Sequence, residues 1–261
     1  MIKSLSTAAT GMEAQETRLN VTANNIANVS TAGFKKSRAE FQDLMYQTLR
    51  AAGAPTSAST RAPTGLQVGA GARVIATQKM MSEGELRQTD NPLDVAIEGR
   101  GFFAVTMPGG DTAYTRDGGF KLDSEGRMVT SDGYPLASDI TIPPDVQTVT
   151  IGADGTVSAT VQGEPAPVEV GTIELTMFAN PAGLESTGRN LFRETAASGT
   201  PTGAAPGSDG AGTLSQGTLE LSNVKVVEEM IDLIAGQRAY EINSRVIKAA
   251  DEMLGQTAML K

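Results

Sequence analysis

The sequence predicts an α+β fold in which paired N- and C-terminal coiled-coil helices carry an inserted β-rich domain. Three observations support this fold class. Apolar residues recur every seven positions near both ends of the chain, the apolar period changes to two between these ends, and Gly-rich turns separate the segments of period two. The two terminal segments are therefore expected to pair with each other across the whole middle of the chain.

A heptad pattern predicts the first helix, over about residues 3–28. Apolar side chains recur every seven residues, and small residues flank them on the same stripe, which is typical of a helix that packs closely against another helix. The repeating positions are Leu5, Met12, Leu19 and Ile26. Gly33 follows as a stop signal.

Three asparagines, Asn24, Asn25 and Asn28, lie close together at the end of this helix. Asparagine is a poor residue inside a helix because its side chain competes for backbone hydrogen bonds. The cluster indicates either a frayed helix end or amide side chains that bond to a neighbouring segment and fix its register. The residues alone do not decide between these two interpretations.

The second helix is expected over about residues 224–258. Ser222 or Asn223 is expected to cap it, and Glu228 and Glu229 fall in its first turns. Its heptad positions are Val226, Leu233, Tyr240, Ile247 and Leu254.

Both heptad stripes are narrow and lined with small residues, so an isolated pair of helices would leave much of each seam in contact with water. Helices from other copies of the chain are therefore expected to complete the packing, and the heptad residues together with the three asparagines are the candidate self-assembly residues. A lone subunit cannot bury these seams, so the helices are expected to be largely disordered in solution and to order only on assembly.

The middle of the chain is expected to form many short strands. The expected strands are 94–97, 102–105, 113–115, 120–122, 128–130, 148–151, 156–161, 166–177 and 218–221. Residues 51–65 and 196–213 are rich in Gly, Ala, Ser, Thr and Pro and are expected to be loops or linkers.

This pattern divides the chain into three regions. Residues 1–34 and 224–261 are expected to form a terminal helical assembly domain, and residues 81–195 a β-rich outer domain. Residues 35–80 and 196–223 are expected to form an extended or β-rich region that connects them.

Composition excludes several classes of function. A net charge of −9 argues against nucleic acid as a partner, because phosphate binding requires clustered Lys and Arg. The absence of His and Cys excludes Ser-His-Asp and Cys-His catalysis and the usual zinc sites. A sugar-binding head on a stalk would require clustered aromatic side chains, and aromatic residues make up only 4% of the chain.

The remaining chemical candidates are weak. The nearest carboxylate pairs are Asp90 with Asp94 and Asp123 with Glu125, both in turn-rich segments where charge usually serves solvation. Residues 99–104 match G-x-G-x-x-A, but a strand pattern follows rather than a helix, so this segment is expected to be a turn between strands. We therefore expect no catalytic, cofactor or metal site, and no enzyme.

The start of the chain also bears on targeting. It has no apolar run of the length that a cleaved signal peptide contains, and no stretch of the chain is long and apolar enough to span a membrane. The sequence is compatible with a cytoplasmic protein or with one that is exported without a cleaved signal.

Two terminal motifs resemble those of one family. Residues 23–35 (ANNIANVSTAGFK) resemble the N-terminal signature of bacterial flagellar rod and hook proteins, the axial family of the flagellum, and residues 237–244 (QRAYEINS) resemble its C-terminal signature. Residues 99–103 (GRGFF) and 114–118 (YTRDG) fit the same family between them. The resemblance covers essentially the whole chain.

The resemblance implies a non-enzymatic structural subunit. The chain length, and the segment from residues 46–50 to 65–69, resemble the members that polymerise helically into the distal rod, a rigid hollow shaft of the flagellar basal body that transmits torque from motor to hook. In those members the extra segment, residues 46–68 here, keeps the shaft straight and stiff. A proximal-rod or hook subunit of the same axial family is the alternative.

The resemblance also implies partners and a location. The expected partners are other copies of the chain in a helical homopolymer, the proximal rod proteins, the hook protein, the surrounding L and P ring proteins, and the flagellar type III export apparatus. The expected location is the flagellar basal body, where the shaft spans the periplasm after export without a cleaved signal peptide.

Overall fold

The computed structural model describes residues 2–55, 61–161 and 167–259, and the chain divides into two compact units. The helical unit contains Met1–Ala27, Ser37–Gln78 and Lys225–Lys261, and the β unit contains Asn28–Lys36 and Lys79–Val224. The residues expected to form a connecting region are divided between the two units. Most of 35–80 lies in the helical unit, and 196–223 lies in the β unit.

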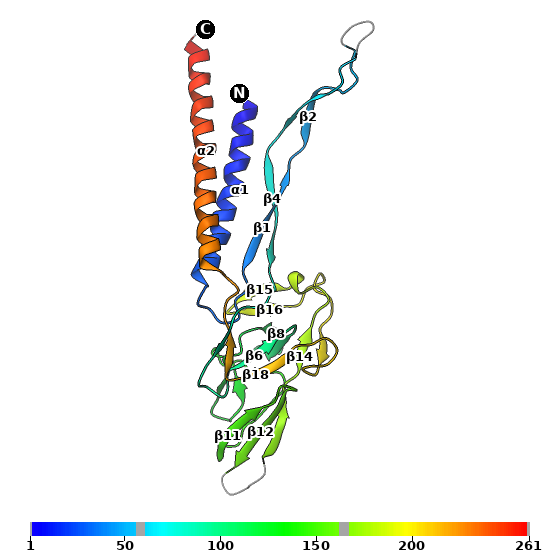
Figure 1. The fold of residues 1–261 in the computed structure, drawn as a ribbon, viewed down its shortest axis with the longest axis vertical. Coiled ribbons are helices and arrows are strands. Elements are labelled where there is room, and N and C mark those ends of the chain that lie inside the picture. The colour runs from blue at the N-terminus through cyan, green and yellow to red at the C-terminus, as the bar shows by residue number, and fades with distance from the viewer. Residues whose placement is uncertain (1, 56–60, 162–166, 260–261) are drawn as a thin grey trace. The chain divides into compact units, whose positions relative to one another are not determined.

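The helical unit is built on two long helices. Helix α1 (Ile2–Ala27) and helix α2 (Val226–Met259) run antiparallel beside each other, as Figure 1 shows. Both predicted helices are confirmed to within two residues at each end. Among the described residues, no helix is long and apolar enough to cross a membrane.

The expected cap of the second helix is wrong. Because α2 begins at Val226, neither Ser222 nor Asn223 is adjacent to its first residue. The hydroxyl of Ser222 instead accepts a hydrogen bond from the backbone N–H of Val224 (3.3 Å). The side chain of Asn223 bonds to other segments of the β unit. Glu228 and Glu229 do lie in the first turn of α2, where the helix dipole favours negative charge.

Four strands follow α1 in the helical unit, where the sequence predicted an extended or β-rich region over residues 35–80 but no individual strands. Strand β1 pairs with β4, and β2 pairs antiparallel with β3. Their bounds are β1 (Ser37–Asp43), β2 (Tyr46–Arg50), β3 (Leu66–Gly69) and β4 (Ala72–Lys79). They bury no side chain fully, so they lack the alternation that marks a half-buried strand. The expected loop 51–65 falls partly on residues 56–60, which lie outside the described residues.

A six-stranded sheet forms the centre of the β unit. Its strand order is β15-β16-β8-β7-β14-β17, and every recorded pairing within it is antiparallel. The strands are β7 (Phe102–Thr106), β8 (Thr112–Thr115), β14 (Leu175–Met177), β15 (Glu185–Gly188), β16 (Leu191–Arg193) and β17 (Thr202–Ala204).

Smaller sheets complete this unit. The three-stranded sheet is ordered β11-β12-β13, and the pairs are β9 with β10, β6 with β18, and β5 with β19. The bounds are β5 (Leu86–Gln88), β6 (Val95–Glu98), β9 (Lys121–Leu122), β10 (Met128–Val129), β11 (Val146–Ile151), β12 (Thr156–Val161), β13 (Val168–Thr172), β18 (Thr213–Gln216) and β19 (Thr218–Glu220). A short 3-10 helix, η1, spans Pro181–Gly183.

The alternation of side chains along the central strands separates two apolar clusters. Successive residues of a strand point to opposite faces of its sheet. Phe102 accordingly joins an aromatic cluster in which its ring meets Phe178 edge to face, with 5.8 Å between centroids. Phe103, the next residue, joins the main aliphatic core and meets Phe120 in the same manner at 5.1 Å. One strand therefore supplies both cores.

The turn before this strand contains Gly99 and Gly101, whose φ angles of 115° and 140° favour glycine. The interpretation of residues 99–104 as a turn leading into a strand is confirmed, because β7 begins at Phe102.

A side-chain amide covers part of one edge of the three-stranded sheet. Gln216 donates from Nε2 to the carbonyl oxygen of Val149 (2.8 Å), and its Oε1 accepts from the N–H of Ile151 (3.1 Å). Its Nε2 also donates to the carbonyl oxygen of Pro92 (2.8 Å). The side chain of Gln216 thus takes the place that a further strand would occupy beside β11.

Phe103→Ala tests the core of the β unit. Phe103 is 0% exposed, so the substitution is expected to lower the free energy of unfolding of the β unit by about 3–5 kcal/mol. Urea unfolding of the full chain, followed by a signal from the sheet, measures this change. Val168→Ala, at a side chain that is 45% exposed, is the control and should change stability little; equal losses in both variants would contradict the assigned core.

Candidate self-assembly interface

The two helices approach closely where small residues lie between them. A side chain on Gly236 would begin 3.0 Å from Cδ2 of Leu19, and one on Gly11 would begin 3.0 Å from Nδ2 of Asn243. Both separations are tighter than ordinary van der Waals contact. Gly236 of α2 thus faces α1, and Gly11 of α1 faces α2. These two close contacts restrict how far the antiparallel helices can slide along each other.

Most of the heptad residues are half-buried on the two helices, and Leu19 lies against Gly236 in the seam between them. The half-buried ones are Leu5, Met12, Leu19, Ile26, Val226, Leu233, Ile247 and Leu254. Tyr240 differs from them, because 41% of its surface is exposed. The heptad side chains are therefore only partly covered within one chain.

Asn25 binds three segments of the helical unit. It is only 2% exposed, and its Nδ2 donates to the carbonyl oxygen of Ser37 (2.9 Å) and to Oε2 of Glu229 (3.1 Å). Its Oδ1 accepts from the N–H of Ser37 (2.9 Å). One amide thus joins the end of α1, the start of β1 and the first turn of α2, which favours the register interpretation for this asparagine.

The other two asparagines occupy different surroundings. Asn28 lies just beyond α1, in the β unit, and its Oδ1 accepts from the hydroxyl of Thr31 (3.3 Å). Asn24 is exposed on α1. The structure therefore does not bring the three asparagines to one place, and the sequence did not single out Glu229, the partner of Asn25 on α2.

A second apolar stripe lies on α2 away from this seam. Its members follow the i, i+3, i+4, i+7 spacing that places side chains on one face of a helix. They are Val227, Met230, Ile231 and Ile234, with exposed fractions of 71%, 52%, 62% and 49%. We call these four residues the outer stripe. It continues as Ile242, Val246 and Met253, which are also exposed. Sequence reasoning missed it because only the heptad positions were followed.

The segment expected to stiffen a polymer forms a thin ribbon. Its described residues, 46–55 and 61–68, include β2 and all of β3 except the last residue, Gly69. Tyr46 lies opposite Gly69 and Gln47 opposite Val68. Tyr46, Leu49 and Leu66 are each more than half exposed. A two-stranded ribbon with exposed apolar side chains is marginally stable in water, so these side chains are available for a contact.

The N-terminal motif continues into a buried ion cluster of the β unit. Nζ of Lys35 lies 2.5 Å from Oε1 of Glu220, and NH1 of Arg116 lies 3.4 Å from Oε2 of the same carboxylate. All three side chains are at most 4% exposed. Burial lowers the pKa of the Lys35 ammonium and that of the Arg116 guanidinium, whereas the attraction of Glu220 opposes both shifts.

Glycine is required next to this cluster. Gly33 has a φ of 68°, and its N–H donates to the carbonyl oxygen of Glu220 (2.8 Å). A side chain there would begin 2.5 Å from the backbone nitrogen of Asp117, which no residue could tolerate without a shift of the backbone. Asn223 completes the junction: its Oδ1 accepts from the N–H of Lys36 (2.7 Å), and its Nδ2 donates to the carbonyl oxygen of Met80 (2.8 Å).

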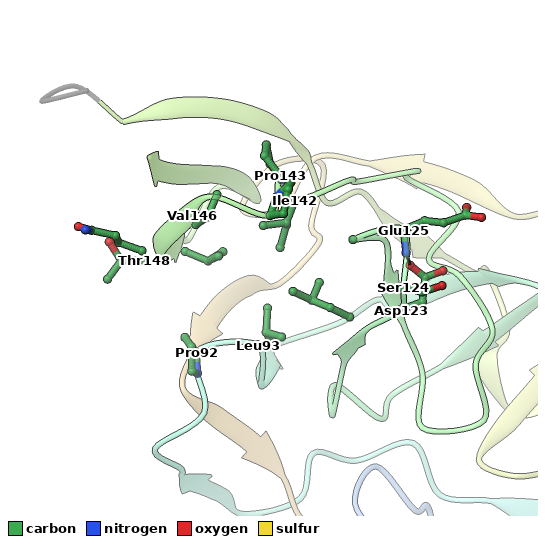
Figure 2. A pocket seen from close by; sticks show the side chains of 14 residues that line it. Pro92, Leu93, Asp123, Ser124, Glu125, Ile142, Pro143, Val146 and Thr148 are labelled. Atoms are coloured by element: carbon green, nitrogen blue, oxygen red, sulfur yellow. Dashed lines mark hydrogen bonds between the residues drawn. The ribbon is translucent and has the colours of Figure 1, made fainter. Parts of the chain in front are cut away.

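One carboxylate pair considered for catalysis lies at a pocket of the β unit. The pocket has a volume of about 630 Å³, and Figure 2 shows Asp123 and Glu125 beside its apolar residues, which include Leu93 and Ile142. Arg127 binds both carboxylates, at 2.8 Å and 3.2 Å. Backbone N–H and side-chain donors of Arg127 lower the pKa of Asp123, whereas a general acid requires a raised pKa.

Asp94 of the second pair is held by hydrogen bonds in a turn. Asp94 accepts hydrogen bonds from the hydroxyl of Thr89 (2.7 Å) and from Nδ2 of Asn91 (2.8 Å), which gives it a structural role. Within the described residues, no group of three or more Asp or Glu side chains is placed to hold a metal ion.

Comparison with known proteins gives the same family along most of the chain. Residues 5–35 match the model described as flagella basal body rod protein, residues 96–159 match the flagellar hook protein FlgE/F/G D1 domain, and residues 215–260 match the C-terminal model of the flagellar basal body rod FlgEFG proteins. These ranges include both terminal motifs.

Full-length relatives decide which member of this group the chain is similar to. A flagellar basal-body rod protein FlgG of Buchnera aphidicola subsp. Schizaphis graminum is 52% identical over 260 residues, covering 100% of both chains. The chain belongs to the FlgG family of flagellar basal-body rod proteins. FlgG proteins of Caulobacter vibrioides and Bacillus subtilis are 48% and 41% identical, again over 100% of each chain. The predicted family is confirmed, and so is the predicted role as a structural subunit of the distal rod.

Asn25→Ala tests the polar junction of the FlgG-family helical unit. Removal of the amide leaves the N–H and carbonyl of Ser37 and the carboxylate of Glu229 without this partner, and is expected to lower the free energy of unfolding of the helices by about 1–3 kcal/mol. Hydrogen exchange at the Ser37 amide measures the effect directly. Asn20→Ala, at an exposed position of α1, is the matched control and should leave that amide protected.

Glu220→Gln tests the buried ion cluster. It leaves two buried cations without their carboxylate and is expected to lower the free energy of unfolding of the β unit by about 3–5 kcal/mol. Glu98→Gln makes the same change at an exposed residue of β6 and should have little effect in the same urea titration. A β unit of unchanged stability in Glu220→Gln would show that the cluster does not hold these segments.

Proposed function

We propose that the chain polymerises through its terminal helices into a helical homopolymer, the rigid and hollow distal rod, which transmits torque from motor to hook. The observation that carries this proposal is the outer stripe of α2, which remains exposed while the opposite side of the helix packs on α1. Contiguous apolar surface of this kind on a water-soluble helix favours a protein contact. The proposed partner of the outer stripe is a helix of another copy.

The predicted self-assembly residues remain part of this proposal. The heptad residues hold α1 against α2, and their uncovered parts border the surface that a neighbouring helix would contact. Asn25 fixes the position of the two helices through Glu229, so that each copy presents the same surface. A contact that repeats between unlike surfaces of identical copies, and does not close into a ring, generates a filament.

The ribbon of β2 and β3 is proposed as a second contact that stiffens the shaft. Its support is the exposure of Tyr46, Leu49 and Leu66 together with the resemblance of this segment to the extra stretch of distal-rod proteins. A second apolar contact between copies would restrict bending, because each copy would then be held at two separate places.

The remaining partners and the location are proposals that rest on family membership. They comprise the proximal rod proteins below the polymer, the hook protein above it, the surrounding L and P ring proteins, and the type III export apparatus. The polymer is proposed to span the periplasm after export without a cleaved signal peptide, with the β-rich domain on its outer surface. The relatives are named as rod proteins, which supports the basal body as the site.

We also propose that the chain is not an enzyme. The support for this is the pairing of Asp123 and Glu125 with Arg127 and the use of Asp94 as a hydrogen-bond acceptor in a turn. These contacts hold the candidate carboxylates in structural roles.

Ile231→Asp is expected to abolish rod assembly. A charge in the centre of the outer stripe would have to be buried without a partner when a second copy packs on it, which costs several kcal/mol. Cells that lack their own copy and express this variant should neither build rods visible by electron microscopy nor swim. The purified variant should keep the helical circular dichroism of the unmodified chain, because Ile231 makes little contact within the chain.

Asn20→Asp is the matched control for this experiment. It adds the same charge at an exposed position of α1 outside the outer stripe, so rods and swimming should be retained. Gln237 lies three residues after Ile234 on the face of the outer stripe, so loss of assembly in Gln237→Asp would support the stripe. Normal rods in Ile231→Asp cells, or equal loss in Ile231→Asp and Asn20→Asp, would contradict the assignment of the outer stripe as the contact between copies.

A further inference from the structure

A small cavity in the β unit lies against the buried ion cluster. It has a volume of about 80 Å³, which exceeds the roughly 10–15 Å³ that a single water-sized occupant needs. Two of the residues that line it are Arg100 and Arg116, and the others include Phe102, Phe178 and Met177. The cavity therefore combines two guanidinium groups with apolar walls.

Arg116 has an unused hydrogen-bond donor at this place. Its side chain is 4% exposed, its NH2 donates to the carbonyl oxygen of Gly99 (2.7 Å), and its NH1 faces Glu220 and the carbonyl oxygen of Ile97 (both 3.4 Å). Its Nε, in contrast, is buried without a hydrogen-bond partner among the described residues. Buried polar groups of folded proteins nearly always have a partner, and an occupant of the cavity that Arg116 lines would supply one.

The charges around the cavity favour an anion as that occupant. Arg116 and Lys35 share the single carboxylate of Glu220, and Arg100 adds a third cation at the lining of the cavity. Glu83, which is exposed, attracts both Lys35 and Arg116 from outside the cluster. The positive charges of this region therefore outnumber the negative charges by one. Apolar walls lower the local dielectric constant and so strengthen the attraction of this extra positive charge for an anion.

We propose that this cavity binds a small monovalent anion of about the size of chloride, held between Nε of Arg116 and the guanidinium of Arg100. A volume of about 80 Å³ matches an ion of this size better than a nucleotide. The bound anion balances the third cation and satisfies the buried N–H. It also bridges the turn that carries Arg100 to the segment that carries Arg116. This site is independent of polymerisation, because all of its residues belong to the β unit.

Chloride itself is the probe. The full chain in dilute solution is expected to broaden the ³⁵Cl NMR line, and added bromide should remove the excess linewidth by competition. Arg100→Gln removes one of the two cations at the cavity and is expected to weaken chloride binding by about tenfold or more, as loss of a charge-assisted contact does. Circular dichroism should be unchanged, since Arg100 is exposed.

Arg38→Gln is the matched control. It makes the same chemical change and the same change in net charge at an exposed arginine of β1, in the helical unit, so chloride binding should be retained. No excess linewidth in the unmodified chain would overturn the proposal and leave water as the occupant. Equal weakening in Arg38→Gln and Arg100→Gln would also overturn it, because the broadening would then reflect the charge of the whole surface.

Discussion

The antiparallel contact between α1 and α2 imposes the main constraint on this chain. Each helix has one apolar seam, and neither seam is covered unless the first and last segments of the chain meet. The same requirement recurs in the β unit, where the entering segment and the leaving segment are hydrogen-bonded to each other through Gly33 and Glu220 and through Lys36 and Asn223. In each unit the segment where the chain enters contacts the segment where it leaves. Loops between these segments could therefore change in length without disturbing the helices.

Buried polar side chains specify where these segments meet. Apolar seams tolerate sliding, since one methyl group packs nearly as well as the next, whereas Asn25 and Glu220 each accept or donate hydrogen bonds at fixed positions. A displacement by one residue would leave a buried amide or carboxylate without its partners. Replacing all members of such a cluster with apolar side chains can stabilise a protein, whereas removing one member destabilises it, so we expect these groups to specify register more than they add to total stability.

The sequence predicted those features that depend on local periodicity. The period of seven located both helices, and the period of two located strands such as 102–105, because burial on one face leaves a regular trace in the chain. Contacts between residues distant in sequence leave no such pattern. Lys35 and Glu220 are 185 residues apart, and the residues adjacent to each in the sequence do not indicate that the two form an ion pair. An extended or β-rich region was expected over residues 35–80, but strands β2 and β3 were not located individually because they bury no face fully. The outer stripe was missed because attention to heptads selects one face of a helix only.

The side chain of Gln216 protects part of a sheet edge against pairing with a strand of another chain. An exposed strand edge offers unpaired backbone groups to any other chain, and protein sheets are commonly protected against pairing edge to edge. Gln216 presents an amide to Val149 and Ile151 in the geometry of a neighbouring strand, and so occupies backbone groups of β11 that a foreign strand would need. A chain that we propose to associate with copies of itself thereby has part of one sheet edge closed to amyloid-like stacking, while the outer stripe of α2 remains exposed.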